Sequence, residues 1–368
     1  MLGVVVGEAP ISNPWETEEE TAVMAPFSAG SFFGDRFRID AALGAGGMGA
    51  VYRATDLRTE QPVALKVLLK RKHEEEARQR FAREAEILSK ISHPGIVGIR
   101  GYGHAPGGVP WLAMELVEGE TLGERIRRKG ALEPEAFGPV LTAVCDALEA
   151  AHRAGVIHRD LKPDHVMLHR RDDAAVSVKL IDFGLSRAED LKKLTATGTV
   201  IGTPRYMAPE QIASAANTGP RSDVYALGVI VYEALTGESP FAASDHGQLL
   251  GAILQGRIEP ASARRPELPA ELDAFFQRAL AKDPAQRFQT PRELNDAFLA
   301  AVGLERGDSP RFSIPPDGLY TPAGSFPSPA PPLERVAREE PRRFWAIVLG
   351  LGLVTAAIAG AVSFLLLR

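Results

Sequence analysis

The sequence predicts an α+β fold with two lobes of unequal size, followed by a single transmembrane helix. Short alternating apolar runs at 37–43, 50–55 and 62–69 are typical of antiparallel strands and predict a small, strand-rich N-terminal lobe. Long helical patterns dominate beyond Gly119 and predict a larger helical lobe. Residues 344–367 contain no charged residue, which predicts a helix that crosses a membrane.

Composition narrows the classes of function. The chain has 368 residues, 45% of them hydrophobic, which is enough for a sizeable core. Its formal net charge is -5 and charges of both signs are scattered along it, so we expect no nucleic-acid partner. Cys145 is the only cysteine, which excludes an intramolecular disulfide and suits a reducing cytosol. Residues 1–10 lack the cationic start and long apolar stretch of a secretory signal peptide.

Changes in composition along the chain predict four segments. The first is acidic without a clear period and the third is rich in proline, so we expect a flexible tail and an extended linker. The predicted segments are a tail at 1–36, a folded domain at 37–300, a linker at 301–343 and a transmembrane helix at 344–367. Within the domain the predicted parts are a small lobe at about 37–114, a hinge at 115–119 and a larger lobe at 120–300 with helices at 134–154, 222–235 and 268–282.

The membrane segment is expected to leave the folded domain in the cytoplasm. A helix over 344–367 would span roughly 36 Å, enough for a bilayer core with some tilt. It is apolar all round rather than along one stripe; a buried globular helix is the alternative. Arg335, Arg338, Arg342 and Arg343 precede it, and positive charge marks the cytoplasmic side. We therefore expect a single-pass protein of the cell membrane.

A face of small residues lies within this segment, at Gly352, Ala356 and Gly360. Such a face could pair two membrane helices and so form a homodimer. Small residues are also frequent in membrane helices that do not pair. The sequence leaves both alternatives open.

A glycine-rich run joins the first two predicted strands. Gly44 to Val51 reads Gly-Ala-Gly-Gly-Met-Gly-Ala-Val and matches G-x-G-x-x-G-x-V, a pattern that dinucleotide-binding folds share in part. A dinucleotide site needs a helix that begins within the glycines, whereas residues 50–55 are strand-like. The run therefore predicts a hairpin whose backbone N–H groups can approach phosphates closely. A purely structural hairpin is the alternative.

Lys66 lies in the third predicted strand, in Val-Ala-Leu-Lys, and its apolar neighbours predict that it points inward. A helix is predicted at 74–91, in which Glu84 lies on the apolar face with Phe81. A carboxylate within an apolar stripe needs a counter-charge, so we pair Glu84 with Lys66 and expect Glu86 at the surface.

The stretch from His158 to Val166 reads His-Arg-Asp-Leu-Lys-Pro-Asp-His-Val and is similar to a protein-kinase catalytic loop. Asp182 follows in Asp-Phe-Gly and Glu210 in Ala-Pro-Glu, in the order in which protein kinases carry these motifs. Several ordered motifs are more specific than any one of them. Over about 37–299 the chain resembles the bacterial eukaryotic-like (Hanks-type) serine/threonine protein kinases.

This resemblance implies ATP as cofactor, Mg2+ or Mn2+ as the metal ion, and Ser or Thr hydroxyls of proteins as acceptors. Asp160 would accept the proton of the substrate hydroxyl, Lys162 is typical of Ser/Thr kinases, and Asp182 would hold the metal between phosphates. Lys66 and Glu84 complete the expected catalytic residues. The expected nucleotide-binding residues are Leu43, Gly44, Ala45, Gly46, Gly47, Met48, Gly49, Ala50, Val51, Ala64, Lys66, Met114, Glu115, Val117 and Met167, with backbone groups of Glu115 and Val117 on the adenine.

The resemblance also implies a regulated segment after Asp182. Thr195, Thr197 and Thr199 lie where relatives are phosphorylated, and a phosphate there could pair with Arg159. An unmodified threonine-rich loop is the alternative. The residues expected to support the site are Arg159, Thr203 for the alignment of Asp160 and Lys162, Asp223 as an anchor of the catalytic loop, and Arg287 as the partner of Glu210.

One position departs from the family's pattern. His165 stands where these kinases carry an Asn that binds a magnesium ion and braces the catalytic loop. Imidazole is a softer ligand than an amide oxygen and suits Mg2+ poorly. Two hypotheses follow: a working kinase in which Asp182 carries most of the metal binding, or a nucleotide-binding scaffold whose output is conformational. We favour the kinase because the other expected catalytic and metal-binding residues are all present.

Overall fold

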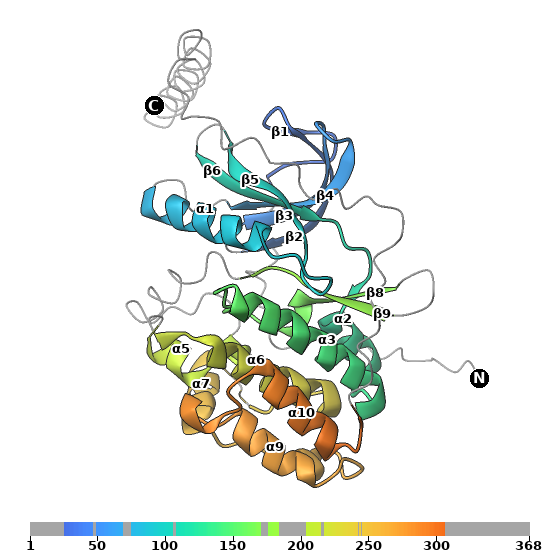
Figure 1. The fold of residues 1–368 in the computed structure, drawn as a ribbon, viewed down its shortest axis with the longest axis vertical. Helices are drawn as coiled ribbons and strands as arrows, with labels where there is room; N and C mark the ends of the chain where they lie inside the picture. Colours follow the sequence, from blue (N-terminus) through green and yellow to red (C-terminus); the bar gives the residue numbers. More distant parts are fainter. Residues whose placement is uncertain are drawn as a thin grey trace, which may run out of the picture. The chain divides into compact units, whose positions relative to one another are not determined.

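The structure is a computed structural model that describes residues 26–46, 49–68, 75–105, 108–170, 176–183, 204–214, 217–241, 243 and 245–305. These residues form a small lobe around a sheet and a larger helical lobe, so the predicted two-lobed fold is confirmed (Figure 1). No helix within the described ranges is long and apolar enough to cross a membrane. The predicted membrane helix at 344–367 lies outside these ranges, as does the linker beyond residue 305.

The small lobe is an antiparallel six-stranded sheet with one helix on it. The strand order is β1-β2-β3-β4-β6-β5, and every neighbouring pair is antiparallel. Helix α1 contacts β5 and β6 and lies along one face of the sheet (Figure 1). The elements are β1 (Phe32–Phe33), β2 (Phe37–Gly46), β3 (Gly49–Asp56), β4 (Gln61–Leu68), α1 (Glu75–Ser89), β5 (Ile99–Ala105) and β6 (Val109–Glu115).

Apolar side chains cover both faces of this sheet. Successive residues of a strand point to opposite faces, so Tyr52 and Leu65 enter one cluster, which contains none of the α1 side chains that the structure describes. Phe81 of α1 packs on the other face with Leu112 and Met114. The sheet is thus buried on both sides, which fixes the direction of every strand side chain near the site.

The N-terminal boundary of the fold differs from the prediction. Phe32 and Phe33 form β1, which pairs with β2, and the Phe33 side chain is buried. Phe27 packs edge to face on Phe33 and on Tyr52. The predicted tail at 1–36 is therefore too long. The strand β1 has only two residues, which is too short to show an alternating apolar pattern in the sequence.

The larger lobe is a helical assembly around α6. Nearly every side chain from Ser222 to Leu235 is buried, as expected of a helix that is apolar all round. The predicted helices at 134–154, 222–235 and 268–282 correspond to α3, α6 and α9. The elements are α2 (Leu122–Lys129), α3 (Pro134–Arg153), η2 (Pro204–Tyr206), α5 (Pro209–Ala213), α6 (Pro220–Thr236), α7 (His246–Gln255), α8 (Ala261–Arg264), α9 (Glu271–Ala279), η4 (Pro284–Gln286) and α10 (Pro291–Ala301).

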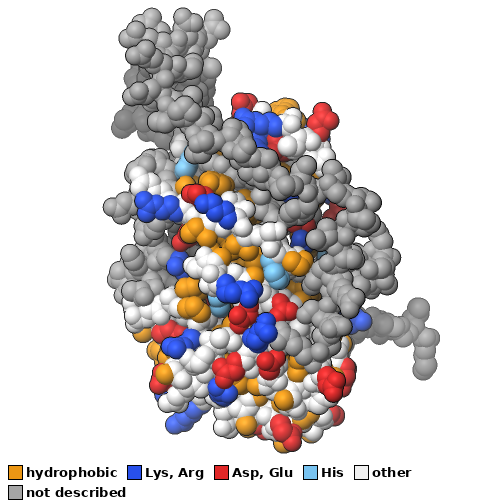
Figure 2. Space-filling model, viewed as in Figure 1, with side chains coloured by type: hydrophobic (Ala, Val, Ile, Leu, Met, Phe, Trp, Pro, Cys, Tyr) orange, Lys and Arg blue, Asp and Glu red, His pale blue; other side chains and the backbone are white. Residues whose placement is uncertain are grey.

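A three-stranded sheet carries the segments that bear the expected catalytic residues. Its order is β7 (Glu120–Thr121), β8 (Val166–Arg170) and β9 (Val176–Leu180), and the short helix η1 (Pro163–His165) precedes β8. The backbone N–H of Val97, in the small lobe's connection to β5, donates to the Leu180 carbonyl at 3.0 Å. On the face shown in Figure 2, basic and acidic side chains are interspersed over the larger lobe rather than separated by sign.

Candidate active site

The loop at 158–166 follows α3 and is held by hydrogen bonds to Asp223, in the first turn of α6. The Asp223 carboxylate accepts the backbone N–H groups of His158 at 2.8 Å and Arg159 at 2.9 Å. Arg159 has φ +63°, in the left-handed region that non-glycine residues rarely adopt. Asp223 therefore stabilises a strained backbone, and the contact that the sequence predicts for it is present. His152, which the sequence reading missed, also contacts this carboxylate, at 2.7 Å through Nε2.

Asp182 lies two residues beyond the end of β9 and pairs with Lys66. Asp182 also has a left-handed backbone, with φ +61°. Its Oδ1 accepts a hydrogen bond from Nζ of Lys66. Burial acts to raise the pKa of Asp182, but the charge and hydrogen bond of Lys66, together with the two neighbouring histidines, outweigh it and hold the pKa below the ordinary value, so the carboxylate is ionised. The site therefore presents a negatively charged oxygen donor next to the strand lysine.

His165 lies between Asp160 and Asp182. Its Nδ1 is 2.7 Å from the Asp160 carbonyl oxygen and its Nε2 is 3.7 Å from Oδ2 of Asp182. The ring stacks on His158, whose own ring packs on Phe183. Burial lowers the pKa of His165 to about 3, so its imidazole is neutral near pH 7. The predicted catalytic aspartate and metal aspartate are thus bridged by the residue that departs from the family's pattern.

The acidic residue on α1 has a different partner from the predicted one. Glu84 accepts from Nη1 of Arg159 at 3.2 Å, whereas the ammonium of Lys66 pairs with Asp182. The expected ion pair between Lys66 and Glu84 is not formed in the part of the chain that the structure describes. The face of α1 was nevertheless predicted correctly: Phe81 is buried, and Glu86 pairs with a lysine at the surface.

The glycine-rich run forms the predicted hairpin. β2 and β3 pair as far as Gly46 and Gly49, so no helix begins within the glycines. A Cβ at Gly49 would overlap the Val67 carbonyl oxygen of β4, whereas a Cβ at Gly44 would meet no atom within 4 Å. Glycine at position 49 is therefore required by the packing of β3 on β4. Gly47 and Met48 lie outside the described residues.

The expected nucleotide-binding side chains are placed by strand register. Val51 pairs with Lys66, so both side chains share one face of the sheet. Ala64 pairs with Met114 of β6, and Met167 lies in β8. Ala50 points the other way into the cluster around Tyr52 and Leu65, so its side chain cannot line the same space. Leu43 is exposed, at 54% of its surface, and Ala45 is also exposed.

The hinge after β6 is held by Glu115. Its backbone N–H donates to the Gly98 carbonyl at 2.8 Å, so only its carbonyl remains for a base. Its side chain pairs with Lys179 of β9 at 2.9 Å, a contact that spacing in the sequence does not reveal. Val117, the other expected adenine-binding residue, packs beside the cluster of Met114 and Leu112.

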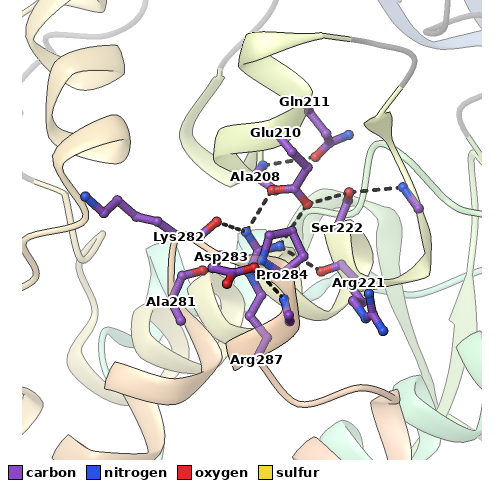
Figure 3. A network of polar contacts seen from close by, with 12 residues as sticks. Ala208, Glu210, Gln211, Arg221, Ser222, Ala281, Lys282, Asp283, Pro284 and Arg287 are labelled. Carbon is purple, nitrogen blue, oxygen red and sulfur yellow. Dashed lines mark hydrogen bonds and ion pairs between the residues drawn. The ribbon is translucent and has the colours of Figure 1, made fainter.

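The predicted pair of Glu210 and Arg287 is present as a buried, bidentate contact. The two guanidinium nitrogens lie 2.8 and 2.7 Å from the two carboxylate oxygens, and the Arg287 side chain is fully buried (Figure 3). Ser222 donates to Oε1 of Glu210 at 2.8 Å. Burial acts to raise the pKa of Glu210, but the hydrogen bonds and charge of Arg287 outweigh it and lower the pKa. The pair fastens η4 and α9 to the start of α5.

The remaining predicted residues are Lys162 and Asp160, which lie in the loop at 158–166, and four threonines beyond the described ranges. Lys162 precedes η1, and its ammonium makes no polar contact with the residues that the structure describes. Asp160 keeps 20% of its side chain exposed. The predicted phosphorylation sites Thr195, Thr197 and Thr199, and the expected support Thr203, lie outside the described residues.

A metal ion would find one well-suited ligand and one poorly suited ligand here. The ionised Asp182 oxygen is the hard donor that Mg2+ prefers. The neutral His165 ring offers nitrogen instead, 3.7 Å from that carboxylate. Among the described residues no group of three or more His, Cys, Asp or Glu side chains could hold a metal. The residues that the structure describes therefore supply a pair of ligands in this region, and phosphates and water would complete the shell.

Comparison with known proteins agrees with this geometry. Residues 37–299 match the family model described as "Protein kinase domain". The chain is similar to serine/threonine-protein kinase PknL of Mycobacterium tuberculosis, with 38% identity over 281 residues, covering 76% of this chain and 68% of that protein.

Solved structures give the same result. A crystal structure of the PknI kinase domain of Mycobacterium tuberculosis aligns with a TM-score of 0.62 and 31% identity, covering 76% of this chain and all of that one. A crystal structure of Rad53 residues 1–466 in complex with AMP-PNP aligns with a TM-score of 0.59 and 29% identity, covering 71% of this chain and 64% of that one.

Proposed function

The chain belongs to the protein kinase family, and from that premise we propose how its residues transfer the γ-phosphoryl group of ATP to Ser and Thr hydroxyls of protein substrates. It is an ATP-dependent serine/threonine protein kinase. The observation that carries the mechanism is the convergence of Lys66, Asp160 and Asp182 on one site with His165 between the two aspartates.

Asp160 positions the acceptor. Its side chain is partly exposed, while its backbone is fixed by His158 and His165, so the carboxylate can accept a hydroxyl proton without moving the loop. Lys162, two residues further on, supplies a positive charge for the transferring phosphoryl group. The loose transition state of phosphoryl transfer needs positioning and charge neutralisation more than a strong base.

Asp182 and Lys66 hold the nucleotide's phosphates. In the structure their charges neutralise each other. A divalent metal ion bound with the nucleotide would be held by the Asp182 carboxylate and would supply positive charge to the phosphates, and the Lys66 ammonium would then be available to phosphate oxygens. Glu84 would take up the freed side of Lys66 once it leaves Arg159. In the structure, Lys66 is thus paired with Asp182 and Glu84 with Arg159, instead of Lys66 with Glu84.

The pairing of Glu84 with Arg159 suggests how phosphorylation regulates the kinase. Arg159 is the cation expected to pair with a phosphate on Thr195, Thr197 or Thr199, and in the structure Glu84 occupies it. A phosphothreonine carries about two negative charges against one for Glu84. Autophosphorylation would therefore displace Glu84 from Arg159 and make it available to Lys66.

We also propose that a divalent ion, Mg2+ or Mn2+, accompanies the ATP, that the chain is anchored in the cell membrane by 344–367, and that its kinase domain faces the cytoplasm. The absence of charge in that segment and the arginines before it support the proposal. Membrane fractionation with protease digestion of sealed vesicles tests it; a kinase domain in the soluble fraction would refute it.

Pairing of two copies through Gly352, Ala356 and Gly360 is the proposed oligomeric form. A membrane association assay compares the wild type with Ala356→Ile, whose bulk should separate the helices. Unchanged association would refute pairing through this face.

The test of the enzyme is incubation of the full-length chain with labelled ATP and Mg2+ or Mn2+, beside the variant Asp160→Asn. We expect label on the chain and on generic Ser/Thr substrates well above the variant. Label no higher than that of Asp160→Asn with either metal would overturn the proposed mechanism and favour a nucleotide-binding scaffold. A melting-temperature shift with AMP-PNP separates loss of chemistry from loss of binding.

A further inference from the structure

His165 is held by its surroundings in one tautomer. Its Nδ1 lies 2.7 Å from the Asp160 carbonyl oxygen, which can only accept a hydrogen bond. Nδ1 therefore carries the hydrogen, and Nε2 carries a lone pair. The ring is nearly buried and stacked on His158 at 5.9 Å between centroids, and a half-turn about Cβ–Cγ would put a carbon in place of Nδ1 and lose the contact with Asp160.

The lone pair of Nε2 faces a carboxylate. Nε2 is 3.7 Å from Oδ2 of Asp182, too far for a hydrogen bond, and makes no hydrogen bond with the described residues. Two electron-rich atoms that face each other are unfavourable unless a cation lies between them. Lys66 neutralises the other oxygen, Oδ1. The Lys66 contact is on Oδ1, so Nε2 and Oδ2 face each other across the gap, and the charges of Lys66 and Lys162 both act on the His165 ring.

The distance suits two ligands of one metal ion. Ligands about 2.1 Å from an ion lie about 3.0 Å apart at a right angle and about 3.5 Å apart at a tetrahedral angle. A small rotation of the Asp182 carboxylate would bring Oδ2 into that range. No change in His165 is required, because Nε2 already points into the gap while Nδ1 is used by Asp160.

The donor set decides the kind of ion. Mg2+ strongly prefers oxygen ligands and ideal octahedral geometry, whereas first-row transition ions accept imidazole together with carboxylate. A tight zinc site would need further protein ligands, and no such cluster is found among the described residues. Phosphate and water oxygens would fill the remaining positions, which suits Mn2+.

We propose that Nε2 of His165 and Oδ2 of Asp182 bind one divalent transition-metal ion together with the nucleotide, so that this position selects Mn2+ over Mg2+. The proposal rests on the proposed function only in requiring a bound nucleotide. It gives His165 two separate tasks: its Nδ1–H braces the loop at Asp160, and its Nε2 binds the metal.

His165→Asn is a matched variant. The Asn amide can still donate to the Asp160 carbonyl, so the brace is retained, while the ligand atom changes from nitrogen to oxygen. His169→Asn is the control, because His169 lies in the neighbouring strand β8 and its Nδ1 contacts the Glu118 carbonyl away from the two aspartates.

The first measurement is a titration of the full-length chain with Mn2+ in the presence of AMP-PNP, followed by electron paramagnetic resonance, with Mg2+ as the competitor. We expect the preference for Mn2+ over Mg2+ to fall by about 10-fold or more in His165→Asn and to stay unchanged in His169→Asn. An equal preference in the wild type and His165→Asn would overturn the proposal.

The second measurement needs no variant. Pulsed electron paramagnetic resonance of Mn2+ bound to wild-type chain labelled with 15N-histidine should show a directly bound histidine nitrogen. Absence of that coupling when Mn2+ and AMP-PNP are both bound would refute the proposal even if His165→Asn does not fold. Both measurements use a nucleotide that is not turned over, so a failure of phosphoryl transfer gives a different result from a failure of metal ligation.

Discussion

Nη1 of Arg159 lies 3.2 Å from Oε1 of Glu84, and this ion pair joins the loop at 158–166 to helix α1. Both side chains are about one-third exposed, at 29% each, so the pair is neither deeply buried nor fully screened. Arg159, which is expected to bind a regulatory phosphate, is thereby paired with Glu84, which is expected to bind Lys66. Competition for Arg159 therefore couples the activation segment to the position of α1.

Replacement of Arg159 by Gln should uncouple activity from phosphorylation. Coupling free energies between two binding sites typically correspond to about 5- to 150-fold in affinity. We expect prior autophosphorylation to raise the wild-type phosphotransfer rate within that range and to leave the Arg159→Gln rate unchanged. The measurement is the initial rate on a generic substrate before and after incubation with ATP.

Arg128→Gln, which removes an exposed pair with Glu120, is the control and should respond to phosphorylation like the wild type. If Arg159→Gln were activated as strongly as the wild type, competition for Arg159 would not be the mechanism.

Breaking the buried pair of Arg287 and Glu210 should destabilise the larger lobe strongly. Arg287→Met leaves the Glu210 carboxylate buried without its counter-charge, and loss of one partner of a buried pair costs about 3–5 kcal/mol in the free energy of unfolding. Urea unfolding of the full-length chain measures it. Lys90→Gln removes only the surface pair with Glu86 and should leave the unfolding midpoint unchanged. Equal midpoints for all three proteins would contradict the prediction.

Glu233 should make the protein less stable as pH rises. Burial raises the pKa of Glu233 above its ordinary value, although Tyr206 donates to it at 2.6 Å. A carboxyl with a raised folded pKa binds more protons in the folded than in the unfolded chain, so stability falls as pH rises from about 4.5 through the folded pKa. The Gln side chain of Glu233→Gln still accepts from Tyr206 and does not titrate.

The stability of Glu233→Gln relative to the wild type should therefore increase between pH 4.5 and pH 7. Thermal unfolding at several pH values measures this difference. The exposed Glu267→Gln serves as the control and should follow the wild type at each pH. A constant or shrinking advantage of Glu233→Gln would show that the carboxylate is not penalised by burial.

Two glycines of the hairpin should respond differently to alanine. Gly49→Ala places a Cβ against the Val67 carbonyl and should lower the free energy of unfolding by about 1–3 kcal/mol. Gly44→Ala meets no atom within 4 Å and should unfold like the wild type. If nucleotide phosphates approach the backbone at position 44, the Gly44→Ala variant should nevertheless bind AMP-PNP more weakly than the wild type. Calorimetric titration and thermal unfolding of both variants separate the effects; full nucleotide affinity in Gly44→Ala would exclude close approach at this glycine.

Local patterns carried much of the fold prediction, and they failed where a partner lies far away in the sequence. The alternation of apolar residues around Lys66 and the three- and four-residue spacing around Glu84 identified the correct strand and helix faces. The spacing of residues within α1 does not determine the position of α1 relative to β4. A displacement of α1 along the sheet changes the partner of Glu84 while the same face of the helix stays buried. The sequence likewise marked His165 as unusual, but its tautomer depends on the Asp160 carbonyl, which only the folded loop brings into contact.

The hydrogen bonds from the loop at 158–166 to Asp223 affect the order in which parts of the protein unfold. The amide hydrogens of His158 and Arg159 are bound by a carboxylate that is 1% exposed and belongs to the first turn of α6, a helix whose side chains from Ser222 to Leu235 are nearly all buried. Those two amides can exchange with solvent only when that helix leaves the core. The loop that bears Asp160 should thus stay intact until the whole larger lobe unfolds, and partial openings that release a substrate would leave it untouched.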